Sequence, residues 1–185
     1  MGLNNRTGGK FITIYDGKFT QKVPAGTEGA ISRVNKLGKE VTEMYYDSFT
    51  GKLVDIKTKE SADYGKSWEF ILSSDDETYT LTLGYSNGLA KALLKMLPNI
   101  NLEEEFTLSP SKKMVDGKEK TSLFVNQGGQ VVKHAFTREN PNGMPEMVLL
   151  KVKGVDTWDD TAQLEFLQNI VNETFKTKEV SLDDF

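Results

Sequence analysis

The chain of 185 residues has no cysteine, a single histidine and no apolar run of roughly 18 residues. The lack of cysteine excludes disulfides, thiolate metal ligands and a cysteine nucleophile. One histidine, His134, cannot form a histidine-based zinc site, so we expect neither a metal nor a cofactor. The lack of an apolar run, together with a polar and glycine-rich start, predicts a cytoplasmic protein without a membrane segment.

Signals for catalysis are weak. The G-x-x-x-x-G-K phosphate loop is missing from the sequence. Two pairs of acids, Asp75-Asp76 and Asp159-Asp160, have the composition of an acid/base or magnesium site. The first pair falls in a predicted turn and the second in the predicted first turn of a helix, where acids are favoured for structural reasons. We therefore predict that the protein is not an enzyme.

Acidic residues are concentrated at the C-terminal end. Residues 154–185 hold eight acids and two lysines, a net charge of −6. The first 153 residues hold 21 basic and 19 acidic side chains, a net charge of +2, so the total of −4 hides a strong asymmetry. A mildly basic body joined to an acidic end leaves a nucleic-acid partner open.

Runs with period-two alternation predict a mainly β protein. They fall at residues 10–15, 18–23, 43–49, 52–59, 67–73, 78–85, 104–113, 120–127, 130–136 and 147–153. Turns are predicted at residues 16–17, 50–51, 74–77, 116–117 and 128–129. Residues 24–39, which are rich in glycine and basic in their second half, are expected to form a loosely packed segment.

Two predicted helices interrupt and follow the strands. Asn87 is in position to cap a helix that ends before Pro98. Thr157 and Asp160 have the spacing of a capping box for a second helix. Its apolar periodicity stops at Phe175, so we expect the residues beyond it to form an exposed tail.

The central order of three strands, a helix and two strands is that of the OB-fold. This fold is a small Greek-key β-barrel whose central strands and bordering loops bind oligonucleotides or oligosaccharides. A mixed α+β sheet could give the same order. The predicted parts are a basic N-terminal extension with a hairpin (1–40), an OB-fold core (41–153), a C-terminal helix (154–175) and an acidic tail (176–185).

The side chains on these strands favour single-stranded nucleic acid as the ligand. Such a ligand needs cations that follow its phosphates and flat rings on which its bases stack. Rings and lysines are interleaved from residue 45 to 70, and a basic hairpin tip lies at the loop between strands 4 and 5 of the OB barrel. The predicted contacts with single-stranded DNA are Tyr45, Tyr46, Phe49, Lys52, Lys57, Lys59, Tyr64, Lys66, Trp68, Lys112, Lys113, Lys118 and Lys120.

Each of these residues has a structural alternative. The rings could belong to the core, and the lysines could form a solvated edge that limits aggregation. Tyr45 and Tyr46 are adjacent on a strand, so they point to opposite faces and one of them should face outward. Trp68 stands at a strand start beside Lys66, where it could be exposed.

The chain ends in S-L-D-D-F, with Phe185 directly after Asp183 and Asp184. In this ending and in its strand order, the chain resembles the single-stranded DNA-binding proteins (SSBs) of bacteria and phages. The resemblance implies an OB-fold, and it implies that these three residues dock on replication and repair proteins. The chain lacks the long Gly/Gln/Pro-rich linker of bacterial SSBs, so it is more similar to phage variants.

We therefore expect a non-catalytic protein that coats single-stranded DNA in replication, recombination or repair, in the bacterial host cytoplasm if it is phage-encoded. Its acidic end, tethered near a basic groove, can compete with DNA for that groove. The alternative is an OB-like structural or adaptor module of a virion that binds protein or glycan. That alternative leaves the acidic ending unexplained.

Overall fold

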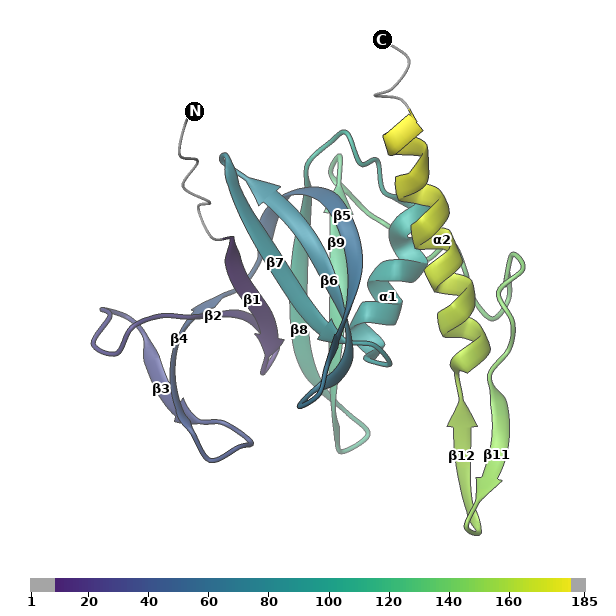
Figure 1. The fold of residues 1–185 in the computed structure, drawn as a ribbon, viewed down its shortest axis with the longest axis horizontal. Coiled ribbons are helices and arrows are strands. Elements are labelled where there is room, and N and C mark those ends of the chain that lie inside the picture. The colour runs from purple at the N-terminus through teal and green to yellow at the C-terminus, as the bar shows by residue number, and fades with distance from the viewer. Residues whose placement is uncertain (1–8, 181–185) are drawn as a thin grey trace.

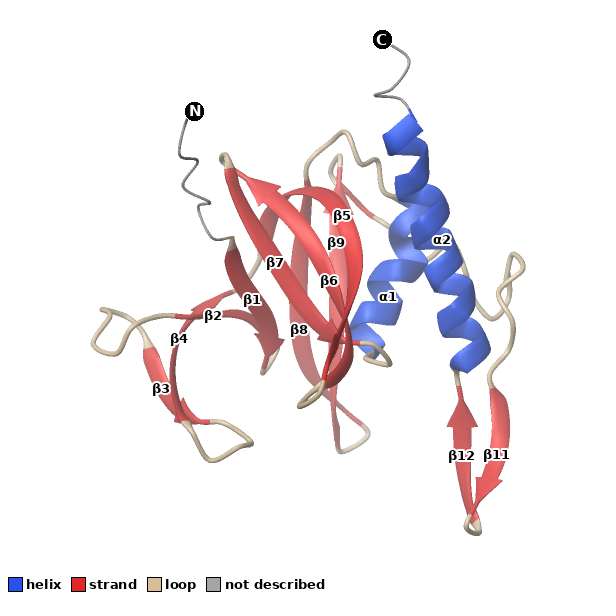
Figure 2. Cartoon of the chain, viewed as in Figure 1, coloured by secondary structure: helices blue, strands red, loops and turns tan. Residues whose placement is uncertain are grey.

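The computed structural model describes residues 9–180, the last four of them by their backbone only. The fold is mainly β with two α-helices, as the sequence predicts (Figures 1 and 2). The strands are β1 (Lys10–Tyr15), β2 (Lys18–Lys22), β3 (Ile31–Val34), β4 (Glu40–Tyr46), β5 (Phe49–Ser61), β6 (Gly65–Ser74), β7 (Glu77–Gly84), β8 (Phe106–Val115), β9 (Lys118–Gln127), β10 (Gln130–Val131), β11 (Val148–Val152) and β12 (Val155–Asp159). The helices are α1 (Gly88–Met96), the short 3-10 helix η1 (Leu97–Asn99) and α2 (Thr161–Val180).

Ten strands form one open sheet in the order β10-β9-β8-β5-β6-β7-β1-β2-β4-β3. Its centre is a meander of three antiparallel strands, β5, β6 and β7. The chain then passes through α1, and β8 returns to pair with β5. The spatial order β8-β5-β6-β7 is that of a Greek key, and β9 extends it as the second strand of a hairpin with β8.

The core lies where the sheet meets the two helices. On β6, the side chains of Trp68, Phe70 and Leu72 are fully buried and alternate with half-buried neighbours, as expected for a strand with one buried face. Leu93 of α1 and Leu167 of α2 belong to the same apolar cluster. Full burial of each such aliphatic or phenylalanine side chain contributes roughly 1.5–3 kcal/mol, so this cluster is the main source of stability.

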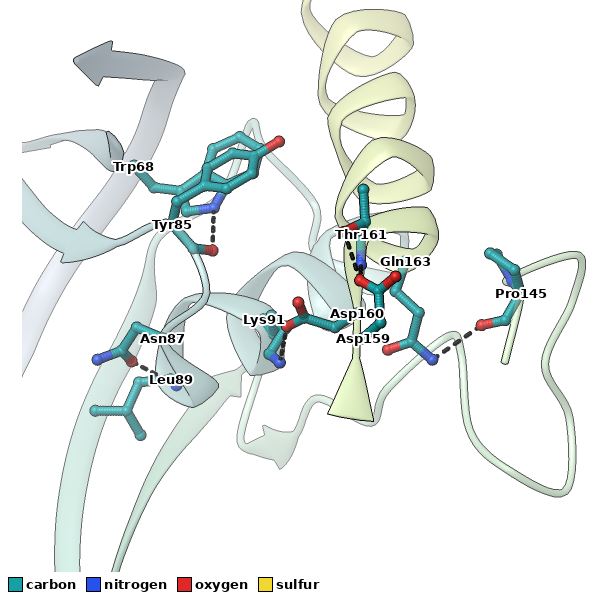
Figure 3. A network of polar contacts seen from close by, with 10 residues as sticks. All are labelled: Trp68, Tyr85, Asn87, Leu89, Lys91, Pro145, Asp159, Asp160, Thr161 and Gln163. Atoms are coloured by element: carbon teal, nitrogen blue, oxygen red, sulfur yellow. Dashed lines mark hydrogen bonds and ion pairs between the residues drawn. The ribbon is translucent and has the colours of Figure 1, made fainter. Parts of the chain in front are cut away.

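Polar contacts fix the helices (Figure 3). The side-chain oxygen of Asn87 accepts a hydrogen bond from the backbone N–H of Leu89 at 2.8 Å, which confirms the predicted cap of α1. Lys91 of α1 and Asp160, directly before α2, form a largely buried ion pair with 2.7 Å between Nζ and Oδ2. This pair joins the two helices.

The N-terminal residues extend the central sheet. The sequence suggests a separate extension, and β1 and β2 do form the predicted hairpin. However, β1 also pairs in parallel with β7, and β4 pairs with both β2 and β3. Residues 31–34, in the segment expected to be loosely packed, are strand β3.

The turn predicted at Thr50 and Gly51 is wrong. Both residues lie within β5, which begins at Phe49, and β4 pairs with β2 and β3 instead of with β5. Glycine is required at position 51 by a close approach between strands. A Cβ atom there would lie 2.1 Å from the carbonyl oxygen of Ser73.

The C-terminal helix begins and ends later than predicted. Residues 155–159 form strand β12, and α2 begins at Thr161, whose backbone N–H donates to the Asp159 carboxylate at 3.0 Å. The helix continues past Phe175 to Val180, because a helix does not need apolar periodicity in every turn. Residues 176–180, predicted as tail, therefore belong to α2. The predicted tip, Asp183, Asp184 and Phe185, lies outside the described residues.

Candidate nucleic-acid interface

One face of the central meander is packed in the core, and the other carries polar side chains. Directly paired residues share a face, so Lys57, Glu69 and Thr82 form one outward row across β5, β6 and β7. The Lys57 Nζ lies 3.7 Å from Asp55 Oδ2, and the Lys59 Nζ lies 3.8 Å from Glu69 Oε1. Both lysine side chains are well exposed, and such loose surface pairs are weak, so the two ammonium groups remain accessible to phosphates.

Next to this row, the outer face of the sheet is hollowed into a groove of about 560 Å³, which we call the Tyr15 groove. Strands β1 to β4 form most of its wall, and the turn between β5 and β6 contributes Tyr64. The lining residues are Thr13, Ile14, Tyr15, Lys22, Arg33, Asn35, Lys36, Leu37, Val41, Glu43, Tyr64 and Thr82. The groove thus combines two aromatic rings with three cations.

Arg33 is held in a fixed position in this groove. Its Nε and Nη2 atoms donate to the two carboxylate oxygens of Glu43 at 2.8 and 3.2 Å. Its guanidinium carbon lies 3.9 Å from the centre of the Tyr15 ring, a cation–π contact. Glu43 is only 2% exposed, and its carboxylate offsets the charge of Arg33. Lys22 and Lys36 form no ion pair within the described part of the chain. The four groups leave the groove with a net charge of +2.

The predicted basic tip is the hairpin of β8 and β9, with its turn at residues 116–117. Lys113 and Lys120 lie directly opposite each other, and the register places Lys118 on the same face. Like charges in this position destabilise a sheet. None of the three lysines pairs with a carboxylate of residues 9–176. An anion between Lys113 and Lys120 would relieve their repulsion, so this pair is a candidate phosphate site.

Lys112 has a different role from the one predicted. Its Nζ lies 2.5 Å from Asp16 Oδ1 and 2.7 Å from Glu119 Oε1. The hydrogen bonds to Asp16 and then to Glu119 raise the pKa of Lys112 above its usual value. Asp16 directly follows Tyr15 in the β1–β2 turn, so this contact fixes the β8–β9 hairpin beside that turn. We therefore remove Lys112 from the predicted DNA contacts and assign it to the positioning of the tip.

Two of the predicted rings are exposed to solvent, but only one of them lies at the Tyr15 groove. Tyr64 is 74% exposed at the β5–β6 turn, at the edge of the Tyr15 groove. Tyr45 and Tyr46 point to opposite faces, as strand alternation predicts for adjacent residues. The half-buried Tyr45 lies on the face of the Tyr15 groove, and the exposed Tyr46 pairs with Phe19 on the core-facing side of the sheet.

The remaining predicted residues lie outside the Tyr15 groove. Phe49 is half-buried and contacts Tyr79 edge to face, with ring centroids 5.2 Å apart. Together with Tyr46 these two rings line a second hollow of about 220 Å³. Lys52 is exposed on β5, and the Nζ of the exposed Lys66 lies 4.1 Å from the centre of the Tyr85 ring.

The prediction for Trp68 is wrong. The side chain is fully buried, its Nε1–H donates to the carbonyl oxygen of Tyr85 at 3.0 Å, and the two rings stack with centroids 4.9 Å apart (Figure 3). A ring without accessible surface cannot stack on a base. Trp68 is therefore a core residue that holds the segment before α1.

Sequence reasoning missed Tyr15, Lys22, Arg33 and Lys36, although these residues form most of the charged and aromatic lining of the groove. A signal for Tyr15 was present, because the alternation in K-F-I-T-I-Y places it on the face opposite the two isoleucines. Lys22 shares this face through the β1–β2 hairpin, whereas Arg33 and Lys36 lie near the groove only because β3 and β4 fold back on β2.

The turn between β7 and α1 reads G-Y-S-N-G, residues 84–88, which fits the G-x-S-x-G pattern of hydrolase nucleophile elbows. The local geometry differs from that motif. Ser86 is not among the residues with positive φ, and the Asn87 side chain caps α1. His134 lies at the opposite end of α1, because the backbone N–H of the next residue, Ala135, donates to the Lys95 carbonyl. The nine residues of α1 span roughly 13 Å, so no described histidine is within hydrogen-bond reach of Ser86.

Comparison with known proteins gives no match among family models, curated proteins or solved structures. Within the described residues, no helix is long and apolar enough to cross a membrane. The same residues contain no group of three or more histidine and acidic side chains arranged to hold a metal ion.

Proposed function

We propose that the protein is a non-catalytic single-stranded DNA-binding protein that uses the outer face of its sheet. The observation that carries this proposal is the Tyr15 groove, where the rings of Tyr15 and Tyr64 lie with Lys22, Arg33 and Lys36. Cations that follow the phosphates and rings on which bases stack are the two requirements for this ligand, and the groove combines them.

The strand order supports an OB-like fold for the centre of the chain. If β5, β6, β7, β8 and β9 correspond to the five OB strands, the two loops that border the ligand site are the β5–β6 and β8–β9 turns. Both turns lie at the lower end of the sheet in Figure 1, and they carry Tyr64 and the lysine pair Lys113 and Lys120. The β1–β4 segment then adds the second wall of the groove.

In this proposal, bases stack on Tyr64 and on the free side of the Tyr15 ring, and the phosphates contact Lys22, Lys36 and the lysines of the tip. Stacking accepts every base because every base has a π-face, so the binding is tolerant of sequence. Each phosphate contact releases counterions, so the affinity falls steeply as salt is added.

We also propose that the ending L-D-D-F recruits replication, recombination or repair proteins, in the cytoplasm of the cell where the DNA is copied. This part is supported by the sequence of Asp183, Asp184 and Phe185 alone. Because α2 extends to Val180, a deletion of residues 181–185 removes the tip without cutting the helix. We expect this deletion to tighten DNA binding at low salt, because the two negative charges of Asp183 and Asp184 no longer compete for the groove.

A structural or adaptor module of a virion is the second candidate. It would use the same outer face to bind a protein or a glycan. The repulsive pair of Lys113 and Lys120 favours an anionic ligand such as DNA over a neutral glycan.

The proposal is tested by fluorescence anisotropy with end-labelled oligo-dT and with a duplex of equal length. An external label is needed because Trp68 is buried and Trp158 lies outside the groove. We expect tighter binding to oligo-dT than to the duplex, with an affinity that decreases as salt increases. Equal binding to both, or no binding to oligo-dT at low salt, would reject the proposal and favour the adaptor.

A further inference from the structure

The hairpin of β11 and β12 exposes apolar side chains on both of its faces. Figure 1 shows it projecting beyond the start of α2, away from the large sheet. Among residues 9–180, its two strands pair only with each other. All five residues of β11 are exposed, and Trp158 of β12 is 61% exposed. A two-stranded hairpin without further packing is marginally stable in water, and a concentration of exposed apolar side chains marks an interaction surface.

The register divides these side chains between two different faces. Leu149 pairs with Trp158 and Lys151 with Asp156, so one face combines two apolar residues with one lysine and one aspartate. The opposite face carries a continuous apolar row with one threonine and one acid, and we call it the valine face. It consists of Val148, Leu150, Val152, Val155, Thr157 and Asp159.

The described residues leave the valine face uncovered. Its four apolar side chains, Val148, Leu150, Val152 and Val155, are 43 to 65% exposed. α2 begins two residues after β12, and its 20 residues carry the chain roughly 30 Å away from the hairpin. The face is therefore available to another molecule.

We propose that the valine face packs against the valine face of a second copy of this chain. The charges at the two ends of the hairpin support this partner. Lys153 lies in the turn at the tip, and Asp159 lies at the base. When two hairpins pack in opposite directions about a two-fold axis, Lys153 of each copy approaches Asp159 of the other, and the apolar rows meet between them.

The contact is small, so the association is weak. A stable dimer usually buries about 800 Å² on each partner, and two five-residue strands offer less than that. We expect a reversible monomer–dimer equilibrium at micromolar or higher concentration, and DNA that gathers several copies would favour it. The association itself does not depend on the proposed DNA binding.

Two adjacent leucines provide a matched test. Leu150 on the valine face is 43% exposed, and Leu149 on the other face is 49% exposed. Sedimentation velocity of the full chain over a concentration series should show a dimer for the wild type and for Leu149→Lys, and only monomer for Leu150→Lys. A wild-type chain that stays monomeric, or a dimer that survives Leu150→Lys, overturns the proposal.

The absence of cysteine from the chain allows a second, direct test. A single Thr157→Cys substitution places a thiol on the valine face, and Ser86→Cys places one on an exposed turn elsewhere. Oxidation should link Thr157→Cys into disulfide dimers and leave Ser86→Cys monomeric; equal linking of both variants overturns the proposal. Oligo-dT binding by Leu150→Lys at nanomolar protein should equal that of the wild type, and a loss there would make the hairpin a DNA contact instead.

Discussion

Lys113 and Lys120 lie directly opposite each other on β8 and β9, at the exposed end of the hairpin, and neither has a carboxylate partner within the described part of the chain. Neighbouring strands usually place opposite charges or neutral residues in such pairs. Lys112, one residue away, shows the contrast, because it is fixed by Asp16 and Glu119.

Replacing one lysine of this pair should raise the stability of the fold and lower the affinity for DNA. Lys120→Gln removes the repulsion, so we expect the free energy of unfolding to rise by roughly 0.5 kcal/mol. The affinity for oligo-dT should fall, and the slope of log K against log salt should decrease by about 0.7 for one lost phosphate contact. Urea denaturation and anisotropy titrations measure the two effects. Lys112→Gln is the matched control, and it should reduce stability. An unchanged salt slope for Lys120→Gln would remove this pair from the DNA site.

Tyr64 supplies the most exposed ring of the groove. Its side chain is 74% exposed, so Tyr64→Ala should leave stability within about 0.5 kcal/mol of the wild type. Loss of one stacked base should weaken oligo-dT binding by roughly 1–3 kcal/mol, whereas Tyr64→Phe should retain the affinity. Trp158→Ala removes an exposed ring outside the groove and serves as the control. Equal affinity for the Ala and Phe variants of Tyr64 would show that the ring does not stack.

Glu43 holds Arg33 against Tyr15 and offsets its charge. Glu43→Gln retains the shape but loses the ion pair, so we expect the free energy of unfolding to fall by roughly 2 kcal/mol. The same change leaves the positive charge of Arg33 without its partner, so oligo-dT should bind more tightly, with a steeper salt dependence. Denaturation and anisotropy measure both effects. Weaker DNA binding by a folded Glu43→Gln protein would indicate that Arg33 needs its present position to contact DNA.

Trp68 should matter for stability and not for DNA contact. Trp68→Phe loses the hydrogen bond to the Tyr85 carbonyl and part of the stacked contact, which should lower the free energy of unfolding by about 1–3 kcal/mol. Trp158→Phe, at an exposed position, should change it by less than about 0.5 kcal/mol. A folded Trp68→Phe protein should bind oligo-dT as the wild type does. A fully folded Trp68→Phe protein with reduced affinity for oligo-dT would show that Trp68 contributes to the DNA-binding site.

The sequence allows most elements of the central meander to be predicted, because their local signals agree with their packing. Alternation predicts β6 and β7, and Asn87 predicts the start of α1. The turn at residues 50–51 was wrong because Gly51 permits close backbone contact with Ser73, a role that a glycine in the sequence does not reveal.

The candidate site is predictable only in part. The β8–β9 tip and Tyr64 follow from hairpin signals and composition, which are local. The burial of Trp68 depends on its contact with Tyr85, 17 residues away, and the position of Arg33 depends on the pairing of β3 with β4. Such pairing is set by the whole sheet, and a strand read alone does not determine it.

Ultraviolet crosslinking of the full chain to oligo-dT that contains 5-iodouracil, followed by mass spectrometry of the linked peptides, shows directly whether single-stranded DNA binds in the Tyr15 groove. Iodouracil reacts with the aromatic ring on which it stacks. We expect crosslinks at Tyr15 and Tyr64, lost with added salt, and none at the buried Trp68. Crosslinks confined to Trp158 on the β11–β12 hairpin, or to rings outside the Tyr15 groove, would contradict this expectation.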